Sequence, residues 1–112
     1  MSYDLKYEDP ISITRVITSK DGRIYIPKKV LKESNLLYAS TNVMSCTNCI
    51  INPDIHIVDE CLKTIDGWNL IDVKDIKKDQ RLRLNVKHLF RAKPGDEFVV
   101  EAYKGELTIY KD

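Results

Sequence analysis

Three cysteines and one histidine in the middle of the chain have the ligand types of a zinc site. Cys46 and Cys49 form a C-x-x-C pair, and His56 and Cys61 follow soon after. Thiolate and imidazole groups are the usual zinc ligands, and a C-x-x-C pair is a common half of such a site. On one strand, however, Cys46 and Cys49 would point to opposite faces. We therefore favour structural thiols, keep zinc and a disulfide as alternatives, and assign no metal or other cofactor.

Groups that could support catalysis are scarce. His56 and His88 have no partnered serine or cysteine motif that would make either of them a general base. The sequence contains no glycine-rich phosphate loop of the G-x-x-x-x-G-K-[ST] or G-x-G-x-x-G type. We therefore expect two surface or packed histidines and a protein that is not an enzyme. The sole tryptophan, Trp68, is expected to anchor a connecting segment against the fold.

The remaining chemistry is that of positive charge, because lysine and arginine cluster in two segments. Residues 15–32 hold six basic side chains and one acidic side chain, and residues 74–93 hold eight and two. The formal charge of +1 therefore excludes a uniform polycation but allows two basic surfaces, which bind nucleic acids by releasing counterions from phosphates. The competing interpretation is a solvated charged face. The candidate DNA-binding residues are Arg15, Lys20, Arg23, Lys28, Lys29, Lys74, Lys77, Lys78, Arg81, Arg83 and Lys87.

The two basic segments belong to an internal repeat. Residues 13–31 align without gaps on residues 71–89, an offset of 58 positions, with six identities. Each copy predicts an extended segment (15–18, 73–76), a polar turn (19–22, 77–80) and an alternating strand (23–26, 81–84). The alternation predicts that Ile24, Ile26, Leu82 and Leu84 face the core and that Arg23, Tyr25, Arg81 and Arg83 face outward.

A short helix and a hairpin complete each copy. The helices are expected at 28–36, with Val30 and Leu31 inward, and at 86–92, with Leu89 and Phe90 inward. The hairpins are expected at 43–58 and 97–110, the second with Phe98, Val100, Leu107 and Ile109 on its core face. This divides the chain into an N-terminal arm (1–12), a first repeat (13–58), a connector (59–69) and a second repeat (70–112), with one core shared by the two repeats.

The order of these elements resembles the AbrB-type swapped-hairpin family, which includes AbrB and SpoVT regulators, MazE-type antitoxins and the tandem-copy regulator MraZ. The motifs that carry the resemblance are T-S-K-D-G-R-I-Y-I-P-K-K-V at residues 18–30 and K-P-G-D-E-F-V-V-E at residues 93–101. The sequence departs from the pattern where Gln80 replaces the turn glycine and Asn85 replaces the proline, and residues 38–42 lack P-G-D.

The resemblance implies a fold, a function and site residues. The expected fold is mostly β with short helices, a swapped-hairpin β-barrel that two tandem repeats complete within one chain. The expected function is that of a transcription regulator that binds double-stranded DNA, with Arg23 and Arg81 at the position of the family's motif arginine. The alternative is an antitoxin-like or other protein-interaction module without DNA binding. A homodimer and a protein partner are left open.

The sequence also indicates a cytoplasmic protein. No apolar run approaches the roughly 18 residues that a membrane span needs, and the start MSYDLKYEDP is too polar and acidic for a signal peptide. Three cysteines do not make the paired framework of a small secreted domain. We therefore expect neither membrane insertion nor secretion.

Overall fold

Short strands dominate the structure, a computed structural model that describes residues 9–46, 54–60 and 68–112. The mostly β fold with short helices is confirmed. The strands are β1 (Ser12–Ile17), β2 (Arg23–Ile26), β3 (Ser40–Cys46), β4 (Ile55–Asp59), β5 (Trp68–Asp75), β6 (Leu82–Asn85), β7 (Glu97–Tyr103) and β8 (Glu106–Lys111). The helices are α1 (Lys28–Glu33), α2 (Ile76–Asp79) and α3 (Val86–Phe90). No helix in these three ranges is long and apolar enough to cross a bilayer.

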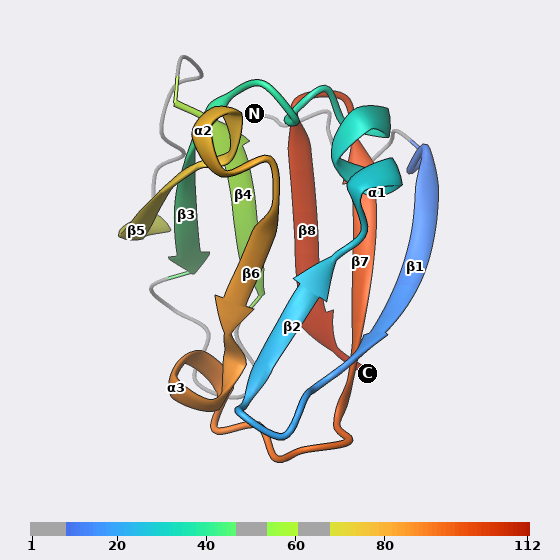
Figure 1. Ribbon diagram of the computed structural model, residues 1–112, viewed down its shortest axis with the longest axis vertical. Coiled ribbons are helices and arrows are strands. Elements are labelled where there is room, and N and C mark those ends of the chain that lie inside the picture. Colours follow the sequence, from blue (N-terminus) through green and yellow to red (C-terminus); the bar gives the residue numbers. More distant parts are fainter. Residues whose placement is uncertain (1–8, 47–53, 61–67) are drawn as a thin grey trace.

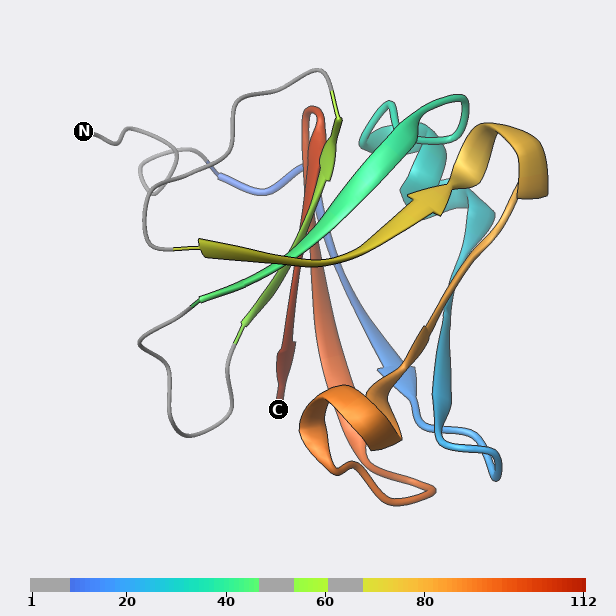
Figure 2. The ribbon, with the colours of Figure 1, turned by 90° about the vertical axis from the view of Figure 1, so that its left-hand side faces the viewer.

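Six of the strands form one antiparallel sheet in the order β1-β7-β8-β4-β3-β5 (Figure 1). The strands β2 and β6 pair only with each other, as an antiparallel ribbon that lies on one side of this sheet (Figure 2). The expected closed barrel is therefore wrong: in the described part of the chain, β1 and β5 are open edges. The physical reason is that the ribbon covers the core by packing its apolar side chains rather than by joining the sheet's hydrogen bonds.

Strand pairing crosses between the two halves of the chain. The first-half strand β1 pairs with β7, and the second-half strand β5 pairs with β3. The 58-residue offset maps the pair Ser12 and Ala102 onto the observed pair Leu70 and Met44. A register shift between Val43 and Met44 moves the pairs formed by residues 40–43 of β3 one position out of this correspondence. The strand order of the large sheet thus reads the same when the two halves are exchanged.

The core lies between the sheet and the ribbon. The alternation predicted for the ribbon is confirmed, since its four apolar side chains are all buried: Ile24, Ile26, Leu82 and Leu84. The core face predicted for the second hairpin is also confirmed, with Phe98, Val100, Leu107 and Ile109 fully buried. Val30 and Leu31 of α1 are buried as expected, whereas Leu89 and Phe90 are only half-buried.

The elements end where local polar groups stop them. The first helix ends at Glu33, before the predicted position 36, because Asn35 takes the left-handed conformation at φ 62°. The predicted turn at 77–80 is the one-turn helix α2, which Asp75 caps by accepting the Lys78 N–H at 3.1 Å. Gln80 then takes φ 56°, the conformation of the glycine that it replaces. The ribbon strands β2 and β6 are therefore preceded by different structures, a turn at 19–22 in the first half and the one-turn helix α2 in the second.

Candidate nucleic-acid interface

The ribbon of β2 and β6 presents a row of polar side chains to solvent. Cross-strand partners in this ribbon are Arg23 with Asn85 and Tyr25 with Arg83. Because the alternate residues are buried in the core, these four side chains share the outward face. Tyr25 is 49% exposed, and Arg83 is exposed as well. The outward face is therefore basic with one aromatic ring at its centre.

Lysines are placed at both ends of the ribbon. One end adjoins α1 and α2, and the other adjoins α3 and the turn at 19–22 (Figure 1). The exposed lysines at the first end are Lys28 and Lys29 in α1 and Lys77 and Lys78 in α2. Those at the second end are Lys20 in the turn and Lys87 in α3. The fold thus brings most of the candidate DNA-binding residues to the neighbourhood of one ribbon, although they are divided between distant parts of the sequence.

The turn at 19–22 is held in place from both halves of the chain. Gly22 takes φ 79°, and its carbonyl accepts the Lys87 N–H at 3.0 Å. The Ser19 hydroxyl accepts the Arg23 N–H at 3.2 Å and donates to the Asp21 carboxylate. The hydrogen bond from this hydroxyl is the main cause that lowers the pKa of Asp21, and the charges of Arg23 and Arg83 lower it further. The Asp21 carboxylate lies 3.6 Å from the Arg23 guanidinium, so it opposes the charge of that arginine at the surface.

The structure separates two of the sequence candidates, Arg15 and Lys74. Arg15 alternates with Val16, which is buried in the core, so Arg15 points to the face of the sheet away from the ribbon. There it forms an ion pair with Asp112. Lys74 occupies the position of Val16 in the second half and lines a hollow beside the ribbon with Asp79, Arg81 and Arg83. Lys74 therefore belongs to the ribbon side, and Arg15 does not.

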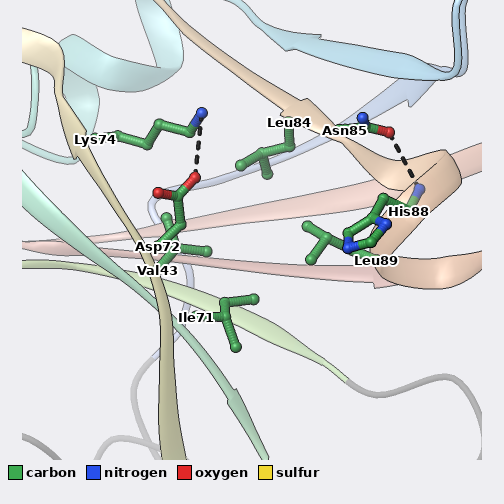
Figure 3. A pocket seen from close by; sticks show the side chains of 8 residues that line it. All are labelled: Val43, Ile71, Asp72, Lys74, Leu84, Asn85, His88 and Leu89. Carbon is green, nitrogen blue, oxygen red and sulfur yellow. Dashed lines mark hydrogen bonds and ion pairs between the residues drawn. The ribbon is translucent and has the colours of Figure 1, made fainter.

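A second hollow opens between β5 and α3 (Figure 3). Four apolar side chains line it, namely Val43, Ile71, Leu84 and Leu89. Polar groups surround them: Lys74 forms an ion pair with Asp72 at 3.4 Å, and Asn85 caps α3 by accepting the His88 N–H at 3.1 Å. The residues of α1 that correspond to His88 and Leu89 are Val30 and Leu31, and both are buried. In the first half, apolar side chains therefore occupy the place that is an open hollow in the second half.

The opposite face of the sheet carries a cluster of tyrosines around one carboxylate. Glu101 accepts a hydrogen bond from the Tyr103 hydroxyl at 2.7 Å and another from the Tyr110 hydroxyl at 2.6 Å. Burial and then this bond raise the pKa of Tyr103, and the bond to Glu101 is the main cause that raises the pKa of Tyr110. The cluster is distant from the ribbon because it lies beyond the sheet.

His56 lies on that same far face. Its Nδ1 is 2.5 Å from a carboxylate oxygen of Glu106, and its ring packs edge-on against Trp68 with centroids 4.0 Å apart. The interpretation of His56 as a packed histidine agrees with this contact. In the described ranges, no group of three potential metal ligands comes together. Cys49 and Cys61 lie outside those ranges, so the three hypotheses for the cysteines, namely structural thiols, a zinc site and a disulfide, stay predictions.

Comparison of the chain with protein-family models, with curated proteins and with solved structures found no match. The function is therefore argued from the geometry of the site. Sequence reasoning found the basic residues but missed Asp72, which pairs with Lys74 on the same strand. It also missed Asn85 and Glu106, whose partners lie on other elements. Only the preference of asparagine for helix N-caps could have indicated Asn85 beforehand.

Proposed function

We propose that the chain is a cytoplasmic transcription regulator that binds double-stranded DNA, not an enzyme, and that it consists of two tandem AbrB-like repeats with exchanged hairpins. The observation that carries the proposal is the β2–β6 ribbon, whose outward face holds Arg23, Tyr25 and Arg83. The crossed pairing of β1 with β7 and of β5 with β3 supports the exchange of hairpins.

The dimensions and chemistry of the ribbon suit a DNA groove. The major groove of B-DNA is roughly 12 Å wide and admits a two-stranded antiparallel ribbon. Arginine forks can bind phosphate oxygens or the acceptor edge of guanine in two-point contacts. The lysines at both ends of the ribbon would then contact the flanking phosphates, which fix register and orientation. The ribbon therefore supplies both kinds of contact that a duplex reader needs.

The test is salt-dependent binding of the full chain to labelled duplexes, followed by fluorescence anisotropy. If about five phosphates are contacted, affinity should fall roughly 10²–10³-fold between 50 and 200 mM salt. The double variant Arg23→Ala with Arg81→Ala should bind more weakly and reduce the salt slope by about two. Arg15→Ala is the matched control, because Arg15 points away from the ribbon, and it should bind like the parent chain. No binding to duplexes of varied sequence at low salt would exclude the proposal.

A second candidate function is protein interaction, which the two edge strands favour. Exposed apolar side chains line them: Ile11, Ile13 and Ile17 at β1, and Leu70, Ile71 and Val73 at β5. An open edge with exposed apolar residues can pair with a strand of another chain, including a second copy. Light scattering over a range of concentrations tests the second copy. A mass that remains that of one chain would exclude homodimerisation through these edges.

A further inference from the structure

One hollow beside the ribbon is lined by three basic side chains of the second half. Lys74 on β5 and Arg81 and Arg83 at β6 line it, together with Asp79 of α2, and its volume is about 160 Å³. Arg81 directly precedes β6 and Arg83 lies within it, so two residues of extended chain separate them by about 7 Å, and both side chains line the hollow. Lys74 approaches from a different sheet. The fold therefore surrounds one space with three cations from two elements.

Carboxylates offset these cations only in part. Among the described residues, Asp79 lines the hollow and Asp72 lies 3.4 Å from the Lys74 ammonium. The charge of Arg83 also helps to lower the pKa of Asp21. Neither Arg81 nor Arg83 forms an ion pair within the part of the chain that the structure describes. Two guanidinium forks therefore remain available for an anion. Planar forks of this kind match the geometry of phosphate oxygens better than an ammonium group does.

The first half lacks the equivalent site. The 58-residue offset places Val16, Arg23 and Tyr25 where the second half has Lys74, Arg81 and Arg83. Val16 is buried in the core, and Tyr25 carries no positive charge at neutral pH. The one remaining cation, Arg23, has the Asp21 carboxylate 3.6 Å away. The cationic hollow therefore lies in the second half, where Gln80 and Asn85 replace the glycine and the proline of the motif.

We propose that the hollow of Lys74, Arg81 and Arg83 binds one phosphate group, which makes the second half the anchoring half of the interface. The inference deepens the proposed function when that phosphate belongs to a DNA backbone. The chemistry is the same for a free phosphate or a phosphate monoester, so the site itself does not depend on DNA. Bound DNA would be held unequally by the two ends of a ribbon whose backbone is symmetric.

The first arm of the test uses inorganic phosphate and no DNA. The protein labelled with ¹⁵N is titrated with phosphate at constant ionic strength, with chloride as the reference, and the arginine Nε–Hε signals are followed by NMR. Saturable shifts are expected for Arg81 and Arg83 and not for Arg23. Lys74→Val and Arg83→Tyr introduce the first-half residues at these surface positions, and each should weaken phosphate binding by about tenfold. Circular dichroism of each variant checks that the fold is kept.

The second arm measures duplex affinity for Arg83→Gln and Arg23→Gln, which remove the same charge from the central pair of the ribbon and from its first-half end. Arg83→Gln should cost about tenfold and Arg23→Gln about threefold at equal salt. DNA binding with equal losses, and no phosphate shifts, would overturn this proposal and leave the proposed function standing. Phosphate shifts without DNA binding would keep the site, assign it to a free phosphate or monoester, and exclude the proposed function. If neither DNA nor phosphate binds, both proposals fail.

Discussion

Tyr25 and Arg83 face each other across the antiparallel pair of β2 and β6, and they are also the two residues that the 58-position offset makes equivalent. An approximate two-fold axis therefore passes through this pair. The axis relates the backbone of the two halves but not their chemistry, because one side of it carries a phenol and the other a guanidinium. The outward face is thus symmetric in shape and asymmetric in charge.

The turn glycine should be the most sensitive position at the ribbon. Gly22 takes φ 79°, and an added Cβ would lie 2.5 Å from the Lys87 Cβ. We expect Gly22→Ala to lower the free energy of unfolding by about 2–4 kcal/mol, from left-handed strain and overpacking together. Urea denaturation measures it. Gly95→Ala is the control, because Gly95 takes φ 92° with open space around it, and it should cost only about 1–2 kcal/mol. Equal losses would contradict the role of the Lys87 contact.

The equivalent position in the second half can be improved. Gln80 takes φ 56°, which a glycine adopts without strain. Its amide donates to the Lys77 carbonyl at 2.9 Å and, at the longer distance of 3.4 Å, to the Leu37 carbonyl. Gln80→Gly should raise the free energy of unfolding by about 0.5 kcal/mol, because relief of strain outweighs the lost bonds and the added freedom of the unfolded chain. Gln80→Ala keeps the strain and loses the bonds, so it should be destabilised by a similar amount. Denaturation midpoints of the two variants on the same side of the parent would refute this.

The tyrosine cluster should make the protein sensitive to alkaline pH. The folded state raises the pKa of Tyr103 and Tyr110, so it favours their neutral phenols. Unfolded tyrosines ionise near pH 10, so stability should be retained below that pH and fall as the pH rises above it toward the folded pKa. Glu101→Gln removes the negative acceptor and should lower the pKa of Tyr110. Spectrophotometric titration of tyrosinate, with Tyr103→Phe and Tyr110→Phe to assign the signals, checks this; an unchanged Tyr110 titration would disprove it.

The charge of Asp21 should weaken binding at the first half of the interface. Its carboxylate lies 3.6 Å from the Arg23 guanidinium on the surface of the ribbon turn. Under the proposed function, Asp21→Asn should strengthen duplex binding about twofold to fivefold at low salt, because local repulsion of phosphates is removed. Asp112→Asn makes the same charge change beside Arg15, on the far face of the sheet. A similar gain in both variants would point to net charge rather than to a local site.

Local patterns in the sequence were sufficient for much of the fold. The alternation of Arg23-Ile24-Tyr25-Ile26 predicts the ribbon strand and its buried side, and the pattern from Phe98 to Ile109 predicts the second hairpin. Both patterns are local, because alternation of apolar and polar residues requires only that one face of the strand is buried, whichever element covers it. The one-turn helix α2 was predicted as a turn, because a four-residue helix leaves no periodic signal and rests on the cap at Asp75.

The sequence by itself determined where the charge lies along the chain, which residues alternate into the core and that two segments repeat at an offset of 58 positions. The tertiary structure decided how these parts meet. It left the sheet open, turned Arg15 toward Asp112 on the far face, and placed Lys74 beside Arg81 and Arg83. Strand pairing and the lining of a hollow depend on contacts between residues that are distant in sequence. The spacing of residues along the chain does not specify those contacts.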